Sequence, residues 1–488
     1  MPLTTPFFPL WRSQLAAWGS RLADPLTVLR VATLAQLEER FADCLPEELF
    51  PKAAKALNSR DRIYTPRRTF WCFLSQCLSP HTSCREVVRQ VQALFKLHDG
   101  PHVSEEDGAY CRARQRLPLT QLSKALLATA QAAEGQAPPS DFLGGRPVKI
   151  VDGSSVTLPD TPANRAAYPK ISTLKVSCGF PMMRLVVMFS LLSGAILNMV
   201  CGNMYTSELP LFHQLMKQLA RADIVLGDRG FGNYVILCLL QAFGIDFLGR
   251  SARKIDGRRR LLRLGRNDWL VRWRPSMNPS AFLSTEAWAA LPKELSVRIV
   301  RGSLYRPGFR VRQVSLVTTL LDAAVYPAEQ ILRAYLRRWR LEMCLDDLKT
   351  TLGMEMLRCQ SPAMVEKEAL LYLIAHNLIR IVMAQAARAY QVPIDRLSFK
   401  GCLDALRQFN HAMCQARSKR KRRQLWEELL RTLAADQVPD RPDRREPRAI
   451  KRKKNRYPRL NAPRHKFRDH LKRNARRTKS RLRKLILK

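Results

Sequence analysis

The sequence predicts a mixed α/β protein with an N-terminal helical domain, an antiparallel β insertion and a basic C-terminal tail. Three observations lead to this prediction. Strand-like and helix-like segments alternate over residues 146–250, and apolar and basic residues alternate over 251–314. Residues 441–488 hold 22 Lys or Arg against 3 Asp or Glu. With 488 residues, 46% of them hydrophobic, the chain can form several packed domains.

Residues 1–145 are interpreted as a helical, DNA-binding domain. The segment TPRRTFWCFLSQCL opens with a Thr-Pro pair typical of a helix start and continues as an apolar stripe. Later, SEEDGAYCRARQRLP places acidic residues first and arginines last, as the helix dipole favours. Arg112 and Arg114 in this segment are candidate DNA contacts. A helical bundle with a solvated basic face explains them about as well.

Residues 146–250 are predicted to begin a mixed sheet. RPVKIVDGSSVTL is β-rich, and LVVMFSLLSGAILNMV has a Ser-Gly turn between two β-rich halves. ADIVLGDRGFGNY reads as a strand that ends in a glycine-rich turn, with helical patterns on both sides. The region therefore combines a hairpin with a strand–helix–strand unit.

The rest of the chain divides into three predicted parts. Residues 251–314 form the β insertion, whose strands alternate apolar and basic positions. Residues 315–435 complete the core with a strand and long helices, the first from about residue 327 to 352. Residues 436–488 form a basic tail that can neutralise phosphates. The basic face of the insertion carries Arg258, Arg259, Arg260, Arg272 and Arg274.

The net charge of +42 indicates a polyanionic partner, most commonly nucleic acid. A membrane surface is the competing interpretation. It is weak, because the longest apolar run, Leu185–Val200, contains polar residues and is shorter than the ~20 residues of a span. The N-terminus lacks the pattern of a secretory signal. The twelve cysteines include no Cys-x-x-Cys pair, which indicates reduced thiols in a cytoplasmic protein.

One cysteine cluster, CFLSQCLSPHTSC, contains Cys72, Cys77, His81 and Cys84. Its spacing matches no common zinc module. Packing of cysteines between helices is therefore the favoured interpretation, and a zinc site is the minor one.

Three carboxylates are candidates for metal-dependent chemistry. Phosphodiester cleavage commonly uses two divalent metals, and hard cations prefer carboxylate oxygens. Asp152 interrupts an apolar strand, and Asp228 ends the next buried strand of that type, where a charge is costly unless it is paired or metal-bound. Glu342 lies in the predicted helix 327–352. Taken singly, the aspartates also fit turn caps, and Glu342 fits an i,i+4 partner of Arg338.

The segment YLRRWRLEMCLDDLK places Tyr335, Arg338, Glu342 and Lys349 within one stripe of a helix, at about 100° per residue. This Tyr-x2-Arg-x3-Glu-x6-Lys pattern resembles the signature of the IS4 group of bacterial insertion-sequence transposases, a branch of the DDE transposases. VDGSS and GDRGFGNY resemble the two aspartate motifs of that group, in the same order. The long interval before Glu342 fits the β insertion of the group.

The resemblance implies a ribonuclease-H-like catalytic core. Asp152 would lie on its first strand, Asp228 on its fourth and Glu342 on a following helix, where they would be catalytic and bind two Mg²⁺ ions, with Mn²⁺ as a substitute. The implied activity is cleavage at insertion-sequence ends and strand transfer into target DNA. The implied partners are double-stranded DNA, as terminal inverted repeats and target, and a second copy of the chain in the DNA complex. The implied location is the bacterial nucleoid.

The resemblance also implies DNA contacts. Tyr335, Arg338 and Lys349 would follow the DNA end with a hydroxyl, a bidentate cation and a point charge. In relatives a tryptophan of the insertion stacks on a flipped base. Trp288 is our candidate, with Trp269 and Trp273 as alternatives, and a core role is the favoured interpretation of each.

Other interpretations remain open at the level of sequence. Asp346 is the nearest rival to Glu342, whereas Asp347 is rotated about 140° away and is a poor one. A catalytically inactive, transposase-derived DNA-binding protein is the alternative function. An RNA-binding or RNA-cutting protein is a weaker one, since no RNA-binding module is recognisable.

Overall fold

The structure is a computed structural model of the 488-residue chain. Its described residues begin at 41 and end at 439, with gaps. They are 41, 43–51, 63–79, 82–97, 99–137, 142–170, 179–250, 260–275, 280, 282–304, 312–416 and 418–439. The predicted basic tail from residue 440 onward, His81, Arg258 and Arg259 lie outside them.

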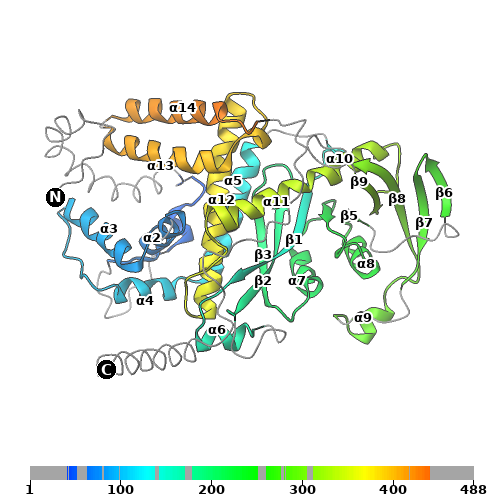
Figure 1. Ribbon diagram of the computed structural model, residues 1–488, viewed down its shortest axis with the longest axis horizontal. Coiled ribbons are helices and arrows are strands. Elements are labelled where there is room, and N and C mark those ends of the chain that lie inside the picture. The colour runs from blue at the N-terminus through cyan, green and yellow to red at the C-terminus, as the bar shows by residue number, and fades with distance from the viewer. Residues whose placement is uncertain are drawn as a thin grey trace, which may run out of the picture.

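A nine-stranded mixed sheet organises one half of the described structure, in the order β3-β2-β1-β4-β5-β9-β8-β7-β6 (Figure 1). Strands β1, β4 and β5 are parallel, and the remaining neighbours are antiparallel. The first five positions of this order are the core strands that the sequence predicted, with the hairpin β2–β3 at one edge. The strands are β1 (Val148–Thr157), β2 (Met182–Ser190), β3 (Ile196–Asn203), β4 (Ile224–Gly227), β5 (Asp246–Arg250), β6 (Arg260–Gly265), β7 (Asp268–Trp273), β8 (Leu295–Leu304) and β9 (Arg312–Thr318).

Helices pack on both faces of the sheet. Helices α7 (Glu208–Leu215) and α8 (Tyr234–Ala242) enclose one apolar core, which includes Val151 and Val225. The opposite face, with Ile150 and Leu226, packs towards the long helices and belongs to the larger core. Both central strands are therefore apolar on both faces, as expected for parallel strands covered by helices.

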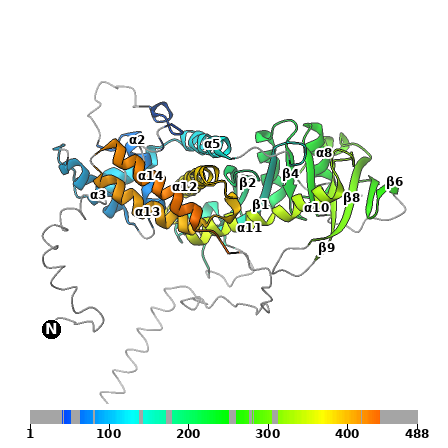
Figure 2. The same cartoon turned by 90° about the horizontal axis from the view of Figure 1, so that it is seen from above.

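The helical half surrounds one buried helix, α12 (Figures 1 and 2). Among the described helices, α12 alone is long and apolar enough to cross a membrane, and 94% of its most apolar window is buried inside the described structure. Its neighbours include the predicted Thr-Pro helix, in which Thr65 caps the first turn. The helices of this half are α2 (Pro66–Leu78), α3 (Cys84–Leu97), α4 (Gly108–Arg116), α5 (Leu119–Gln136), α12 (Pro362–Ala389), α13 (Phe399–Gln415) and α14 (Lys419–Ala435).

Helix α12 also fastens the β2–β3 hairpin. The Asn377 side chain accepts a hydrogen bond from Ile196 N (2.7 Å) and donates one to Ile196 O (2.9 Å). Arg380 donates to the carbonyl of Ser193 at 2.6 and 2.8 Å, beside Gly194, whose φ of 70° suits a glycine. The tight turn and the central helix are thus held in one arrangement.

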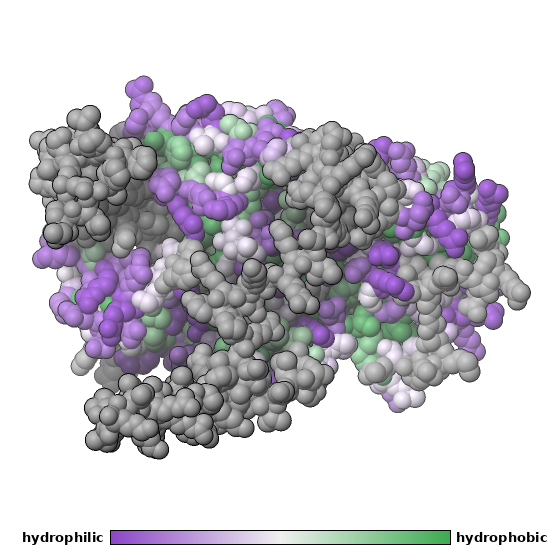
Figure 3. Space-filling view, in the orientation of Figure 1, coloured by the Kyte–Doolittle hydropathy of each residue, from purple (hydrophilic) through white to green (hydrophobic). Residues whose placement is uncertain are grey.

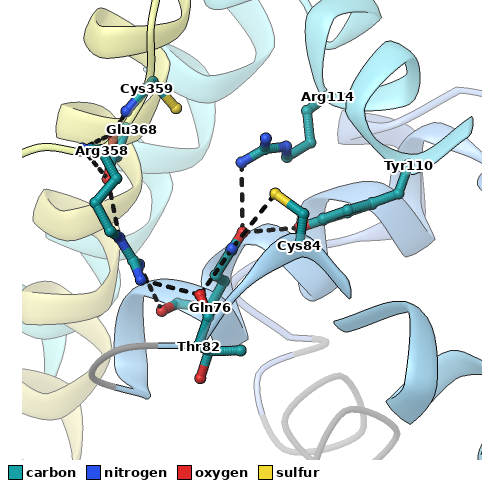
Figure 4. Close-up of polar contacts among 8 residues, drawn as sticks. All are labelled: Gln76, Thr82, Cys84, Tyr110, Arg114, Arg358, Cys359 and Glu368. Atoms are coloured by element: carbon teal, nitrogen blue, oxygen red, sulfur yellow. Dashed lines mark hydrogen bonds and ion pairs between the residues drawn. The ribbon is translucent and has the colours of Figure 1, made fainter. Parts of the chain in front are cut away.

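A polar network joins α2 and α4 to α12 (Figure 4). Buried Glu368 accepts from the backbone N–H groups of Arg358 and Cys359 at 2.8 to 3.1 Å. The guanidinium of Arg358 in turn donates to the carbonyls of Thr82 (2.9 Å) and Gln76 (3.2 Å). These contacts link segments that are nearly three hundred residues apart in the sequence.

The predicted β insertion is antiparallel, and its strands continue the core sheet. Strand β9 pairs with both β5 and β8, so β6–β9 extend one continuous surface. Short helix α9 (Thr285–Ala289) lies between β7 and β8. Fully buried Arg298 holds this extension: it forms a two-pronged pair with Asp268 (2.6 and 2.9 Å) and donates to the carbonyl of Tyr326 (2.7 Å). The predicted boundaries of the five domains stay a prediction.

The remaining elements are connections. They are α6 (Pro162–Ala167), three short 3₁₀ helices (Glu47–Leu49, Met216–Gln218 and Ile394–Arg396), and the segments α10 (Ala328–Arg337), α11 (Trp339–Asp346) and a π-helical turn (Asp347–Thr351). The last three correspond to the single helix predicted over residues 327–352.

Asp268→Asn should destabilise the protein by about 3–5 kcal/mol, because it leaves the buried charge of Arg298 without its partner. Urea unfolding followed by fluorescence of the nearby tryptophans would measure this. The matched control is Glu294→Gln, which removes an exposed pair with Arg272 and Arg274 and should cost about 0–1 kcal/mol. Equal effects of the two variants would contradict the role given to Arg298.

Candidate active site

The parallel pairing of β1 with β4 brings two predicted carboxylates together. Val151 is the register partner of Gly227, and each of these residues is followed directly by one of the two aspartates, Asp152 and Asp228. Asp152 and Asp228 therefore lie just beyond the last residue pair of β1 with β4, at the carboxyl end of β4. Ligands of α/β sheets bind at this edge. Asp228 is partly exposed there, as expected of a residue that ends a buried strand.

Asp152 is partly enclosed, with 23% of its side chain exposed. Burial raises its pKa to about 6, and the nearby charges of Asp228 and Glu208 act in the same direction. The Gly153 N–H, which donates to its Oδ1 at 2.8 Å, and the guanidinium of Arg338 oppose that rise in pKa. A nearby cation stabilises the ionised form of a carboxylate in this setting.

Arg338 lies between Asp152 and Glu342. Its Nη1 is 3.8 Å from Oδ2 of Asp152, and its Nη2 is 3.2 Å from Oε1 of Glu342. Only 12% of the Arg338 side chain is exposed, and its buried Nε has no hydrogen-bond partner in the described part of the chain. The guanidinium of Arg338 thus lies at the site between two of the three predicted carboxylates.

The helix that carries these residues is interrupted, whereas the sequence predicted one continuous helix. Arg338 is the junction between α10 and α11, and the π-helical turn follows Asp346. Because a π-turn bonds i to i+5, the positions after Asp346 leave the α-helical spacing. Tyr335 and Arg338 remain adjacent, with the guanidinium 5.7 Å from the ring centre. Lys349 lies on the π-turn, and no described hydrogen bond or ion pair joins it to the three carboxylates.

The two rival carboxylates have other surroundings. Exposed Asp346 accepts a hydrogen bond from the Thr350 hydroxyl at 2.7 Å. Asp347 is partly buried, and this burial raises its pKa to about 7, with Arg380 opposing the rise and Asp346 adding to it. Neither has a described contact with Asp152 or Asp228.

The predicted contacts of the helical domain are far from this site (Figure 1). Arg112 is exposed on α4. Arg114 faces inward: its guanidinium lies over the rings of Phe73 (4.7 Å) and Tyr110 (5.1 Å) and donates to Gln76 at 3.4 Å (Figure 4). This placement gives Arg114 a structural role, and its contact with DNA stays a prediction.

The three tryptophans of the insertion differ in packing. Trp269 and Trp273 pack against the core beside α8. Trp288 lies on α9, a helix with no buried residue, and is itself partly exposed. Trp288 therefore stays the candidate for base stacking.

The carboxylates at this site are potential ligands of a metal ion. Carboxylate oxygens suit a divalent hard cation, and the guanidinium at Asp152 and Glu342 indicates a place that favours positive charge. Within the described ranges, no three His, Cys, Asp or Glu side chains lie close enough together to hold a metal ion. The described members of the cysteine cluster, Cys72, Cys77 and Cys84, likewise form no group that could hold a metal ion. A shared ion at the three predicted carboxylates therefore requires these side chains to come closer together.

Sequence reasoning missed one carboxylate near this site. Glu208, the first residue of α7, lies against Gly153 and acts electrostatically on Asp152. A Glu at a helix start is an ordinary pattern, so the sequence held no signal that distinguished it.

Comparison with known proteins agrees with the geometry. The family described as "Transposase DDE domain" matches residues 143–378, a range that contains Asp152, Asp228 and Glu342. The chain is 27% identical over 447 residues to the transposase InsG of insertion sequence element IS4 from Escherichia coli K12, which covers 90% of this chain and 94% of the relative.

Residues 143–378 of the chain belong to the DDE transposases. Within this family the chain is related to the IS4 transposase along almost its whole length, as the Tyr-Arg-Glu-Lys stripe indicated. The family implies the use of a divalent metal. A solved structure, the piggyBac transposase synaptic complex with hairpin DNA, aligns over 83% of this chain and 85% of that one, at 11% identity and a TM-score of 0.38.

Asp152→Asn should stabilise the metal-free protein by roughly 1–3 kcal/mol at pH 8. The raised pKa means that Asp152 binds a proton more tightly in the folded protein than in the unfolded chain. Ionisation of Asp152 therefore lowers the free energy of unfolding as the pH rises from about 4 to about 6, and this cost persists above pH 6. Unfolding midpoints in EDTA at pH 8 and pH 4 would measure the gain, which should largely vanish at pH 4. Exposed Asp346→Asn is the control, and a destabilising Asp152→Asn at pH 8 would contradict the prediction.

Proposed function

We propose that this chain cuts DNA at the ends of an insertion sequence and joins the freed ends to target DNA by two-metal phosphodiester chemistry. The observation that carries the proposal is the register of β1 with β4, which sets Asp152 beside Asp228 at the carboxyl ends of two parallel strands. The family match over these residues supports the same assignment.

Asp152, Asp228 and Glu342 are the proposed ligands of two Mg²⁺ ions. When bound, such ions activate the attacking water and neutralise charge on the phosphodiester. The residues of the chain supply the oxygen ligands and the enclosed setting. Burial around Asp152 limits competing water and strengthens its attraction for a cation.

Arg338 connects DNA binding to the carboxylates in this proposal. In the DNA-free chain its guanidinium compensates the charges of Asp152 and Glu342. A phosphate of the DNA end offers the same guanidinium a two-pronged partner. Transfer of Arg338 to phosphate would leave both carboxylates for metal, so that the metal site is completed where DNA is present.

The charge distribution supports a duplex DNA partner. The chain carries 83 Lys and Arg against 41 Asp and Glu. On the face shown in Figure 3, hydrophilic residues gather over the helical end and over the outer strands. Exposed arginines on both halves, such as Arg112 on α4 and Arg272 on β7, suit a long partner that crosses them. Two ends must meet during transposition, and we infer a dimer in the DNA complex, in the cytoplasm at the nucleoid.

Glu342→Gln should abolish cleavage of a labelled duplex that carries the element's terminal repeat, while binding is retained. The expected loss exceeds about 100-fold, because even partners outside the metal ligands cost 10–100-fold when changed. Asp346→Asn, one turn further on the same helix, is the matched control and should cut normally. Loss of cleavage in Asp346→Asn alone would make Asp346 the third ligand.

The wild-type lanes of this assay separate the proposal from its alternative. Binding of the terminal repeat without cleavage in Mg²⁺ and in Mn²⁺ would indicate a catalytically inactive DNA-binding protein.

Arg338→Gln should weaken binding to the same duplex and lower the slope of log affinity against log salt by about one, because one phosphate contact is lost. Fluorescence anisotropy at several salt concentrations would measure this. Arg333→Gln is the control: Arg333 lies on the same segment, 68% exposed, and pairs with Glu329 at 2.6 Å. If both variants changed the slope equally, Arg338 would have no special contact.

A further inference from the structure

A surface pocket of about 560 Å³ lies where the C-terminal ends of α5 and α12 meet the middle of α14. Figures 1 and 2 show these helices on the helical half of the protein. A pocket of this volume is within the usual range for small-ligand sites. None of its described lining residues is acidic. The polar and aromatic groups of the lining are the amides of Gln136, Gln385 and Gln391, the guanidinium of Arg388 and the indole of Trp426.

This set of groups matches the chemistry of a nucleobase. An indole offers a flat surface for stacking, and every base has a π-face that can use it. A primary amide carries both donors and an acceptor, as the edges of bases do. The two helices that end at the pocket direct the negative end of their dipoles towards it, so a neutral ring is favoured there over a phosphate. The phosphates of such a ligand therefore belong outside the pocket.

Helix α14 places cations next to the pocket. It begins with five consecutive basic residues, KRKRR, and Trp426 follows shortly after them. Lys419, Arg423, Trp426 and Leu430 lie on one face of the helix, because they are separated by four, three and four residues. The first two side chains are exposed, and the last two are partly buried and line the pocket. Cations and a stacking surface thus follow one another along one line, as in proteins that bind single-stranded nucleic acid.

The cations at the start of α14 are available to phosphate. Arg423 pairs with Glu427 at 3.0 Å, but the two side chains are 84% and 59% exposed, so this pair is weak and exchangeable. Among the described residues, no acidic side chain pairs with exposed Lys419 or Lys421. The positive end of the dipole of α14 lies at the same place and favours an anion further.

A packing role alone is the simpler interpretation of Trp426. Part of its indole packs against the larger core. In that role its replacement would lower stability and would leave recognition of bases unchanged. Packing does not explain the amides and Arg388 around the pocket, or the cations that precede the indole on the same face of α14.

We propose that the pocket at Trp426 is a second nucleic-acid site, which stacks one base of an unpaired DNA strand while the start of α14 binds the adjacent phosphates. Its elements belong to the helical half, whereas the candidate carboxylates lie at the edge of the sheet (Figure 1). The inference rests on the proposed function only in taking DNA as the polymer. It adds a preference for unpaired bases, which a basic surface by itself does not provide.

The first test compares two labelled strands of about 8 nucleotides, a length within the site sizes of single-strand binders. One is oligothymidylate and the other is an abasic strand with the same phosphates. Fluorescence anisotropy of the full-length chain in EDTA should show about tenfold tighter binding of oligothymidylate, because one stacked base contributes an effect of that order. Equal affinity for the two strands would overturn the proposal, because the protein would then recognise charge alone.

Variants of Trp426 assign that preference to the pocket. Trp426→Ala should bind the two strands almost equally, and Trp426→Phe should keep most of the preference because it keeps a ring. The slope of log affinity against log salt should stay as in wild type, since no cation is lost. A wild-type preference in Trp426→Ala would overturn the proposal, because another part of the chain would then stack the base.

A second pair of variants tests the pocket without removing the indole from the core. Ala389 is an exposed lining residue at the end of α12. Ala389→Leu should fill the pocket with an aliphatic side chain and abolish the preference for oligothymidylate, whereas Ala389→Ser should keep it. An unchanged preference in Ala389→Leu would show that the base does not enter the pocket, and would overturn the proposal.

Two further measurements test the role of α14. Lys419→Gln should lower the salt slope by about 0.7, the value for one phosphate contact of a single strand. Lys217→Gln is the control, because Lys217 is exposed on the 3₁₀ helix Met216–Gln218 in the sheet half, and it should leave the slope unchanged. Thymidine monophosphate should bind at least about tenfold more weakly than the strand. Equal binding of both would assign the pocket to free nucleotides and overturn the role of a strand.

This site and the proposed cleavage activity fail independently. A wild-type protein that prefers oligothymidylate but does not cut in Mg²⁺ or Mn²⁺ would contradict the proposed function and support this site. A protein that cuts at the terminal repeat but shows no preference for oligothymidylate would keep the proposed function and overturn this site. Glu342→Gln should keep the wild-type preference, because the binding assay contains no metal.

Discussion

The parallel pairing of β1 with β4 is the constraint on which the site depends. Side chains alternate between the two faces of a strand, so a slip of one residue would turn Asp152 towards the opposite face. The apolar residues of both strands prevent that slip, because Val151 and Val225 are buried beneath α7 and α8 while Ile150 and Leu226 are buried on the other side. The position of the two aspartates is therefore secured by the hydrophobic cores around them.

A strongly basic protein has to keep an acidic site available. Elsewhere in the sheet the acidic residues are neutralised by arginine or lysine, and in the case of Asp268 and Arg298 the pair is completely enclosed. At the site the arrangement differs. Arg338 is the cation that contacts two of the carboxylates, and it is also a suitable partner for phosphate. In the function proposed above, competition of DNA phosphate and metal for these charged groups would link binding of the partner to assembly of the site.

Several predictions from local pattern were confirmed. The strand and helix order of the core follows the expected sequence, and the aspartates and Glu342 lie on the predicted elements. The segment predicted as one helix over residues 327–352 is helical from Ala328 to Thr351, but it is interrupted at Arg338 and ends in a π-turn. Periodicity describes an ideal helix and does not locate such deviations, and Tyr335, Cys344 and Leu348 of this segment are buried in the core.

The sequence by itself determined the fold class and the family and predicted three candidate carboxylates, because the patterns that indicate them lie within short segments of the chain. Only the tertiary structure decided which charges meet. Arg338 lies between Asp152 and Glu342, Arg114 turns inward to Gln76, and Glu208 fills the space above Gly153. The physical reason is that Coulomb and contact energies act over a few ångströms, between residues that the folded chain brings together from distant positions.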